Sequence, residues 1–152
     1  MNMRERLQAA MKDAMRAKEA DRLSTIRLVN AAIKDRDIAV RGDGTDALVS
    51  DGDILGILGK MVKQRQESAR AYEEGGRLEL AEKELAEIRV IEEFLPRQLD
   101  PKEVDAAIAA AVAEVGATSI RDMGRVMAVL KARHTGQMDF GAVGPRIKDS
   151  LG

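Results

Sequence analysis

The sequence lacks cysteine and has almost no aromatic residues or histidine. Without cysteine the chain can form neither a disulfide nor a thiolate metal site, and a reducing compartment suits it. The aromatic residues are Tyr72, Phe94 and Phe140, too few for a platform of rings that stacks nucleic-acid bases. With His134 as the one histidine, no Ser–His–Asp triad, Cys–His pair or His/carboxylate metal site can be assembled. We therefore expect no catalytic residue in the chain, and no metal or other cofactor.

Long apolar runs and a large net charge are also missing. No apolar run approaches the ~18 residues of a membrane span, and residues 1–6 lack the apolar core of a signal peptide, so we expect a cytoplasmic protein. Lys and Arg number 25 against 26 Asp and Glu, a formal net charge of −1, which gives no overall reason to expect polyanion binding.

The charge is nevertheless distributed unevenly along the chain. Residues 1–41 carry ten basic and six acidic side chains, a net charge of +4. Residues 42–100 carry eight basic and fourteen acidic side chains (net −6), and residues 101–152 carry seven and six (net +1). Any nucleic-acid contact should therefore avoid the acidic middle segment.

The sequence is rich in strong helix formers, namely Ala, Leu, Met, Glu, Lys and Arg. Its 152 residues suffice for one domain or two small ones. Apolar residues recur every three or four positions in residues 2–19 and again after Asp21, which we expect to cap a second helix. The connection between these helices is short, so they should lie antiparallel. Their predicted apolar stripes consist of Met3, Leu7, Met11 and Met15, and of Leu23, Ile26, Val29, Ala32 and Ile33.

Turn-forming residues at 41–46 separate this hairpin from a second one. Ser50 and Asp53 form a predicted capping box at the start of a third helix. Gly75 and Gly76 end that helix, as a left-handed residue after a helix requires, and a fourth helix follows. The facing stripes consist of Ile54, Leu58, Met61, Arg65, Ser68 and Tyr72, and of Leu78, Ala81, Leu85, Ile88 and Leu95.

The loop before the third helix contains two features that imitate ligand-binding motifs. Gly42 and Gly44 form a Gly-x-Gly without the preceding strand that a phosphate cradle needs. Four carboxylates follow without the alternation and the terminal Glu of a calcium loop: Asp43, Asp46, Asp51 and Asp53. We therefore predict a plain solvated loop at both features.

Prolines mark the clearest boundary in the chain. Pro96 disfavours helical geometry at the residue before it. Asp100 then caps a new helix, with Pro101 at its first position and Glu103 at its third. We predict an all-α fold with three parts: an N-terminal four-helix subdomain of two antiparallel hairpins at residues 1–95, a linker at 96–100, and a C-terminal three-helix subdomain at 101–152.

Glycine and proline also divide the C-terminal part. Gly116 ends the fifth helix, Thr118 or Ser119 caps the sixth, and Gly136 closes it. Pro145 would sit too deep in one continuous last helix, so we predict a turn at residues 139–143 and a short helix with Gly144 as its cap. The predicted inner positions are Val104, Ala107, Ile108, Ala111, Val115, Ile120, Met123, Val126, Met127, Leu130, Ile147 and Leu151.

A polar cluster is predicted within the second hairpin. Arg65 lies on the apolar seam of the third helix and should face residues 84–87 of the fourth. A guanidinium there needs a carboxylate, because an unpaired buried charge costs several kcal/mol. The cluster, consisting of Gln64, Arg65, Glu84 and Glu87, is either an internal ion pair that fixes the helix register, which we favour, or a polar pocket.

Five cations lie on or near the last two helices: Arg125, Lys131, Arg133, Arg146 and Lys148. They are suited to neutralising phosphates, with an affinity that falls as salt rises. Six acidic residues share residues 101–152, so from the residues alone we slightly favour a merely solvated face. Gly124 costs about 0.5–1 kcal/mol relative to alanine inside a helix, which close approach of a neighbouring helix, or of a phosphate, would offset. We expect His134 to complement the dipole at the end of the sixth helix.

Several strings in this sequence resemble the YqeY family. They are residues 22–34 (RLSTIRLVNAAIK), 63–68 (KQRQES), 76–84 (GRLELAEKE), 95–99 (LPRQL), 122–127 (DMGRVM) and 136–139 (GQMD). The matches occur in order over nearly the whole chain. Gly144 and Pro145 depart from the family pattern, in which a Ser and a non-proline residue are more usual, and this affects the start of the last helix.

The resemblance implies a two-part helical fold and a role connected with tRNA. The C-terminal part of the family is similar to the tail of GatB, the subunit of the tRNA-dependent amidotransferase that engages the substrate tRNA. Such domains also occur fused to some glutaminyl-tRNA synthetases. The resemblance does not transfer catalysis, because the kinase and glutaminase chemistry resides in other parts of that enzyme.

Three functional hypotheses follow from the sequence. The first is a non-catalytic tRNA-interacting accessory protein, with Arg125, Lys131, Arg133 and Lys148 as phosphate contacts. The second is a component or relative of the glutamine-dependent amidotransferase, a carbon–nitrogen ligase with glutamine as amido-N-donor, which requires an amidotransferase or aminoacyl-tRNA synthetase partner. The third is a protein-interaction adaptor that uses the N-terminal hairpins, with RNA as an alternative partner because residues 1–41 are basic.

Overall fold

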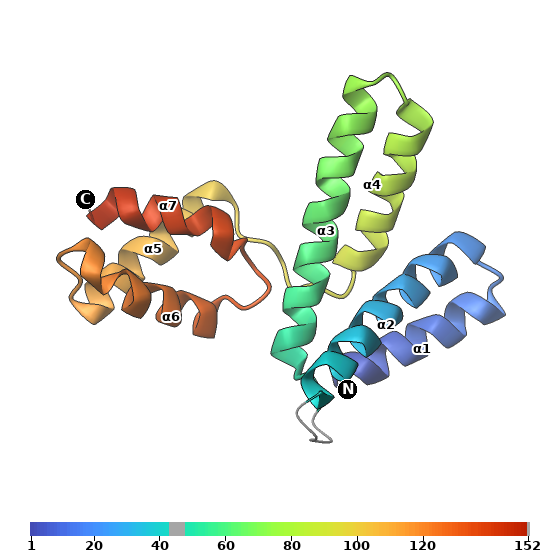
Figure 1. Ribbon diagram of the computed structural model, residues 1–152, viewed down its shortest axis with the longest axis horizontal. Helices are drawn as coiled ribbons and strands as arrows, with labels where there is room; N and C mark the ends of the chain where they lie inside the picture. Colours follow the sequence, from blue (N-terminus) through green and yellow to red (C-terminus); the bar gives the residue numbers. More distant parts are fainter. Residues whose placement is uncertain (43–47, 152) are drawn as a thin grey trace. The chain divides into compact units, whose positions relative to one another are not determined.

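The computed structural model describes residues 1–42 and 48–151, which are all-α and contain no strand (Figure 1). This confirms the predicted fold class. The helices are α1 (Met3–Arg16), α2 (Ala20–Arg41), α3 (Asp51–Glu74), α4 (Leu78–Glu92), α5 (Pro101–Val115), α6 (Met123–Arg133) and α7 (Phe140–Leu151), with a short 3-10 helix, η1 (Ile120–Asp122), before α6. The chain divides into two compact units, Met1–Leu95 (unit 1) and Pro96–Gly152 (unit 2).

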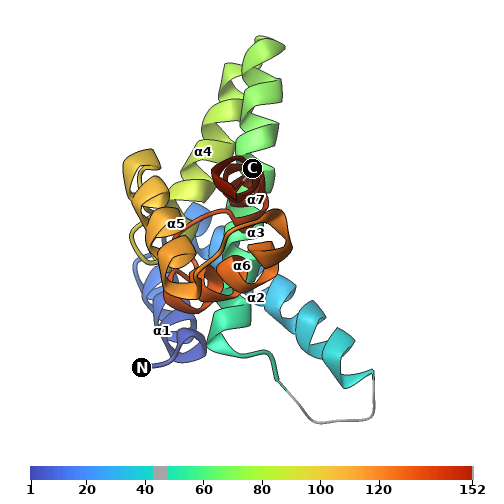
Figure 2. The same cartoon turned by 90° about the vertical axis from the view of Figure 1, so that its left-hand side faces the viewer.

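Unit 1 consists of two helical hairpins. α1 packs on α2, and α3 and α4 lie side by side along their length (Figures 1 and 2). The turn between α3 and α4 has Gly76 at φ 72°, the left-handed conformation predicted for it. Ser50 and Asp53 form the predicted capping box at the start of α3. The core of the unit includes Leu7, Ile26, Val29, Ile54, Leu58 and Ile91, each at most 1% exposed.

The start of α2 differs from the prediction. The helix begins at Ala20, and its N-cap residue is Glu19, which makes no side-chain cap hydrogen bond. Asp21 is therefore not the cap. It is a carboxylate in the first turn of α2, where its negative charge interacts favourably with the helix dipole. The chain turns instead at Lys18, which adopts φ 58°, and the backbone N–H of Glu19 donates to the carbonyl of Ala14.

Two residues predicted to lie on the inner faces of unit 1 are exposed. Met15 is 52% exposed and Leu78 is 67% exposed. Met15 lies near the end of α1 and Leu78 is the first residue of α4, so both are close to a turn. Gly44, Asp43 and Asp46 of the loop lie outside the described residues. Asp51 and Asp53 are first-turn carboxylates of α3.

Unit 2 is a three-helix bundle in which α6 packs against both α5 and α7 (Figure 2). Asp100 caps α5 in a capping box with Glu103, Pro101 is its first residue, and Gly116 ends it at φ 65°, all as predicted. Ser119 caps η1 together with Asp122. Ile120, predicted to be internal, is 49% exposed. The core residues are Val104, Ile108, Ala111, Val126, Leu130, Met138, Val143 and Ile147.

The last helix also differs from the prediction. α7 is continuous from Phe140 to Leu151, with Pro145 inside it rather than at its first turn. Proline removes one hydrogen bond to the carbonyl four residues earlier, which belongs to Gly141. Both Gly141 and Pro145 are exposed, so water can solvate that carbonyl. Gly144 is buried, and a Cβ built on it would lie 3.5 Å from Met123 Cε.

No helix among the described residues is long and apolar enough to span a membrane.

Candidate nucleic-acid interface

Within unit 2, α6 differs from every other described helix because it has no carboxylate side chain. It carries three cations, Arg125, Lys131 and Arg133, and all three are exposed. The sequence folds as a helix here because Met123, Val126, Met127 and Leu130 recur at helical spacing toward α5 and α7. Its opposite side is left to small residues and cations.

Arg125 is held beside the start of α6. Its Nη1 donates to Asp122 Oδ1 at 3.3 Å, and its Nη2 donates to the carbonyl of Val115. The pKa of Asp122 lies below its usual value because the backbone N–H groups of Thr118 and Ser119 donate to its carboxylate, with a smaller contribution from Arg125. The guanidinium is 61% exposed, so this pair is solvated and weak.

The other predicted cations divide into paired and unpaired ones. Arg133 Nη1 lies 2.5 Å from Glu114 Oε2 of α5, and Arg146 pairs with Asp105 and donates to the carbonyl of Pro101 at 3.1 Å. In the described part of unit 2, Lys131 and Lys148 form no ion pair and are exposed. Lys148 borders a shallow hollow that is lined by Thr118, Ser119, Ile120, Lys148, Asp149 and Leu151.

The exposed side of α6 brings two of the predicted contacts onto one surface. Gly124, Arg125, Ala128 and Lys131 are all exposed and follow one another at helical spacing. A Cβ built on Gly124 meets nothing within 4 Å, so the predicted close approach of a neighbouring helix there is wrong. At Gly144 a Cβ would make ordinary van der Waals contact with the side chains of Met123 and Met127.

The polar cluster predicted in unit 1 is formed by two of its four residues. Arg65 Nε donates to Glu87 Oε2 at 2.8 Å, and Nη1 donates to the carbonyl of Met61 at 3.2 Å. The side chains of Arg65 and Glu87 are 16% and 19% exposed. Gln64 is exposed and Glu84 half-buried, and neither takes part in this contact. The arrangement joins α3 to α4.

A second partly buried ion pair in unit 1 was not predicted. Asp37 is 7% exposed and accepts hydrogen bonds from Arg4 at 2.8 and 3.1 Å and from the backbone N–H of Val49 at 2.9 Å. The Arg4 hydrogen bond, and then the Val49 N–H, hold the pKa of Asp37 below its usual value. The sequence did contain a signal, because Asp37 continues the four-residue spacing of Val29 and Ile33 onto the buried face of α2.

No group of three or more acidic or histidine side chains suited to holding a metal ion occurs in residues 1–42 and 48–151. His134 ends α6, and its Nδ1 lies 3.0 Å from Gln137 Oε1.

The chain is similar to fungal proteins named "Altered inheritance of mitochondria protein 41, mitochondrial". It is 31% identical to the one from Vanderwaltozyma polyspora over 103 residues, which cover 63% of this chain and 54% of that protein. The protein from Clavispora lusitaniae is 36% identical over 89 residues, with coverages of 59% and 49%. The protein from Pyrenophora tritici-repentis is 29% identical over 153 residues, with coverages of 97% and 80%. The aligned region thus spans about half the length of the first two relatives.

These names contradict the predicted cytoplasmic location, because the relatives are called mitochondrial. Composition was a poor guide to location: a helical protein without cysteine is compatible with a reducing interior in more than one compartment.

The family comparison covers more of the chain than most of these alignments do. Residues 4–151 match the family described as Yqey-like protein. The match includes both hairpins of unit 1 and all three helices of unit 2. The chain therefore belongs to the YqeY family.

Proposed function

We propose that this chain is a non-catalytic accessory protein that contacts tRNA through the exposed side of α6 and through Lys148 of α7. The observation that carries this proposal is that α6 presents exposed cations on a helix without any carboxylate of its own. Phosphate groups are the ligands that such a surface attracts most strongly, because counterions are released when cations neutralise them.

The ion pairs already present at this surface do not oppose the proposal. Arg125–Asp122 and Arg133–Glu114 are solvated, with guanidinium exposures of 61% and 52%. Exposed pairs of this kind contribute about 0–1 kcal/mol, so exchanging a carboxylate for a phosphate costs little. Lys131 and Lys148 form no ion pair among the described residues, so a phosphate would displace no carboxylate from them.

The chemistry of the surface favours contact with the backbone of RNA rather than its bases. Phenylalanine and tyrosine are absent from α6, so base stacking on rings does not contribute there. Phosphate contacts fix orientation without reading sequence. The choice of tRNA is supported by the resemblance of residues 122–127 to the tail of GatB, since these residues lie at the start of α6.

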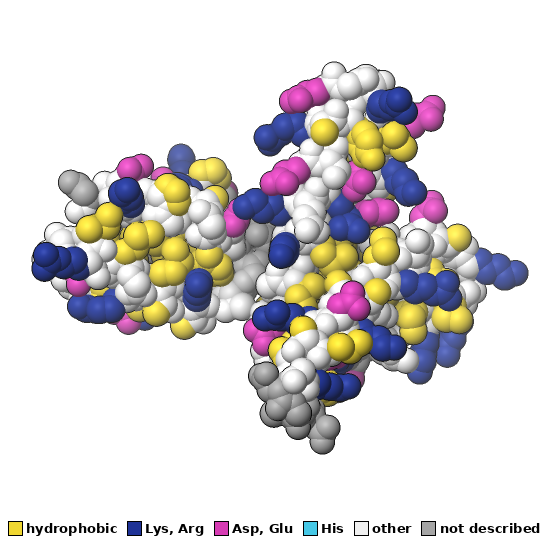
Figure 3. Space-filling view, in the orientation of Figure 1, with side chains coloured by type: hydrophobic (Ala, Val, Ile, Leu, Met, Phe, Trp, Pro, Cys, Tyr) yellow, Lys and Arg dark blue, Asp and Glu magenta, His cyan; other side chains and the backbone are white. Residues whose placement is uncertain are grey.

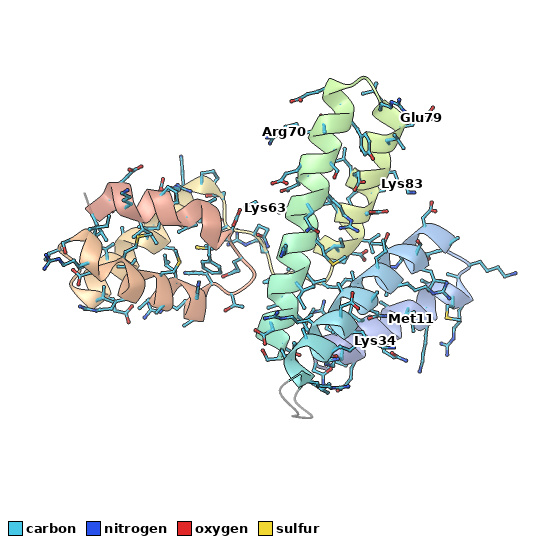
Figure 4. The ribbon with its side chains drawn as sticks, viewed as in Figure 1. Met11, Lys34, Lys63, Arg70, Glu79 and Lys83 are labelled. Atoms are coloured by element: carbon cyan, nitrogen blue, oxygen red, sulfur yellow. The ribbon has the colours of Figure 1, made fainter. Side chains whose placement is uncertain are left out.

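The test is a double substitution on α6 with a charge-matched control. Arg125→Gln/Lys131→Gln should weaken binding of a tRNA transcript on the order of tenfold per contact at about 0.1 M salt. Arg70→Gln/Lys83→Gln removes the same net charge from the acidic α3–α4 hairpin (Figure 4) and should leave affinity unchanged. Equal affinity of the α6 variant and the unsubstituted chain in filter binding would overturn the proposal.

The amidotransferase and adaptor hypotheses stay predictions. Purification of the tagged chain with amidotransferase subunits would favour the first of them. Loss of protein partners on deletion of residues 1–95, with tRNA binding retained, would favour the second for unit 1 and leave the α6 proposal intact.

A further inference from the structure

A row of three cations runs along the exposed side of α2 in unit 1. Arg27, Lys34 and Arg41 follow one another at intervals of seven residues, and all three are exposed. Seven residues are almost two full helical turns, so the three positions lie nearly in line, about 10 Å apart along the helix axis. Figure 4 shows Lys34 on α2, and Figure 3 shows basic side chains gathered over the α1–α2 hairpin. We call these three residues the α2 row.

The α2 row is poorly neutralised by the protein itself. Arg27 and Lys34 form no ion pair among the described residues. Arg41 interacts with the charge of Asp37, but the carboxylate of Asp37 is already bound in two hydrogen bonds by Arg4. Arg133 and Arg146 of unit 2, by contrast, each face a carboxylate.

We propose that the α2 row is a second RNA-binding surface, which contacts phosphates of the backbone independently of α6. Charge complementarity identifies the occupant: residues 1–41 carry a net charge of +4, and a phosphodiester chain offers a negative charge at every nucleotide along a line of cations. The surface goes beyond the function proposed for α6, because it lies on different residues and in a different unit.

A lipid surface fits the same helix less well. Leu28 and Ile38 are 43% and 57% exposed, but they are ten residues apart and the exposed Asp35 lies between them. A helix that lies in a membrane interface needs a continuous apolar face opposite its charged one. The apolar face of α2 is instead buried in unit 1, where Ile26 and Val29 are 0% exposed.

The inference implies that the chain is bivalent for RNA. If one RNA molecule engages both surfaces, the second contact is intramolecular and strengthens binding. Affinity should then depend on salt through both sets of cations, and each lost phosphate contact should reduce the slope of log affinity against log salt by about one.

The experiment uses the full chain with a triple substitution and a matched control. Arg27→Gln/Lys34→Gln/Arg41→Gln removes three charges from the α2 row, and Arg70→Gln/Arg77→Gln/Lys83→Gln removes three exposed cations from the acidic hairpin. The probes are an unmodified tRNA transcript and vesicles of phosphatidylserine and phosphatidylcholine. The circular dichroism signal of the helices and the midpoint of thermal unfolding are measured for both variants to verify that they fold.

We expect the α2 variant to bind the transcript about tenfold more weakly per lost contact, with a salt slope reduced by about three, and the control to match the unsubstituted chain. Unchanged transcript binding by the α2 variant, or equal loss in both variants, would overturn the inference. So would loss of vesicle binding with transcript binding retained, since the occupant would then be lipid. Because Arg125→Gln/Lys131→Gln tests α6 separately, failure at either surface is distinguishable from failure at the other.

Discussion

The two units use charged side chains differently. In unit 1, Arg4–Asp37 and Arg65–Glu87 are largely shielded from water, and each joins segments more than twenty residues apart. In unit 2, every described ion pair includes at least one side chain that is more than half exposed, whereas no side chain of the two unit 1 pairs is more than 34% exposed. These two pairs of unit 1 are therefore part of the packing, whereas the described pairs of unit 2 lie on its surface, as does Arg89–Glu82 of unit 1, whose side chains are 64% and 67% exposed.

The difference bears on function through the cost of breaking each pair. Removing one partner of a buried pair leaves an uncompensated charge, which is costly, while an exposed pair contributes about 0–1 kcal/mol. A phosphate ligand can therefore replace the carboxylate partner of an exposed cation in unit 2 with little loss of stability. In unit 1 the cations suited to a ligand are those outside the pairs, such as Arg27 and Lys34.

The largest expected effect concerns the apolar cores. Leu58→Ala in unit 1 should lower the free energy of unfolding by about 2–5 kcal/mol, because the side chain is 0% exposed and its loss leaves a cavity. Urea denaturation followed by circular dichroism measures the change. Leu80→Ala, at a position that is 38% exposed, is the control. A decrease in the free energy of unfolding of less than about 0.5 kcal/mol, as is usual for surface substitutions, would contradict the buried position of Leu58.

The next effect compares a shielded ion pair with exposed ones. Arg65→Ala should cost about 1–3 kcal/mol, because Glu87 is left half-buried without its partner. Arg89→Ala and Arg133→Ala remove exposed pairs, with Arg side-chain exposures of 64% and 52%, and should stay within about 0.5 kcal/mol. If all three variants unfolded at the same urea concentration, the contrast between the shielded pair and the exposed pairs would be lost.

Acid should weaken both units through carboxylates with lowered pKa values. Arg97 and the backbone N–H of Asp100 lower the pKa of Glu103 from 4.5 to about 2. A carboxylate with a lowered folded pKa stabilises the fold above its unfolded pKa and loses that contribution as the pH falls through the folded value. The stabilisation by Glu103 is thus complete above about pH 5 and lost progressively toward pH 2.

Glu103→Gln should therefore lower the midpoint of thermal unfolding at about pH 7. By the same linkage, the midpoint of the variant should decline less steeply than that of the unsubstituted chain between about pH 5 and pH 2. Asp37→Asn should act in the same direction on unit 1, because hydrogen bonds from Arg4 and Val49 lower the pKa of Asp37. Glu79→Gln, an exposed residue of α4 (Figure 4), is the control. Parallel curves for the Glu103 variant and the unsubstituted chain would refute the role of this carboxylate.

The smallest expected effect comes from two glycines of the α3–α4 hairpin. Gly59 lies inside α3, where a Cβ would meet nothing within 4 Å, so Gly59→Ala should raise stability by about 0.5–1 kcal/mol. Gly76 has φ 72°, so Gly76→Ala should lower stability by about 1 kcal/mol. Changes of the same sign in both variants would contradict these backbone conformations.

The sequence alone predicted the helix ends that are determined by residues close to them in the chain. The capping boxes Ser50–Asp53 and Asp100–Glu103 and the left-handed Gly76 and Gly116 need no partner beyond a few neighbouring residues. The sequence was misleading at Pro145, because packing of Val143 and Ile147 in the core of unit 2 keeps α7 continuous despite the lost hydrogen bond.

The candidate interface was predictable only in part. Residue type and helical spacing indicated that Arg125 and Lys131 lie on α6. The partners of the cations could not be predicted, because Arg133–Glu114 joins two helices whose relative register depends on tertiary packing. The same reason explains why Arg4–Asp37 was missed, although the spacing of Asp37 placed it on a buried face.

RNA binding by exposed cations of both units is tested most directly by a double-mutant cycle. The quantity measured is the slope of log tRNA affinity against log salt concentration. The slope is measured for the unsubstituted chain, the α6 double variant, the α2 row variant and their combination. The account predicts reductions of about two, about three and about five, because distant sites act additively. A combined variant that keeps the slope of the unsubstituted chain would contradict it.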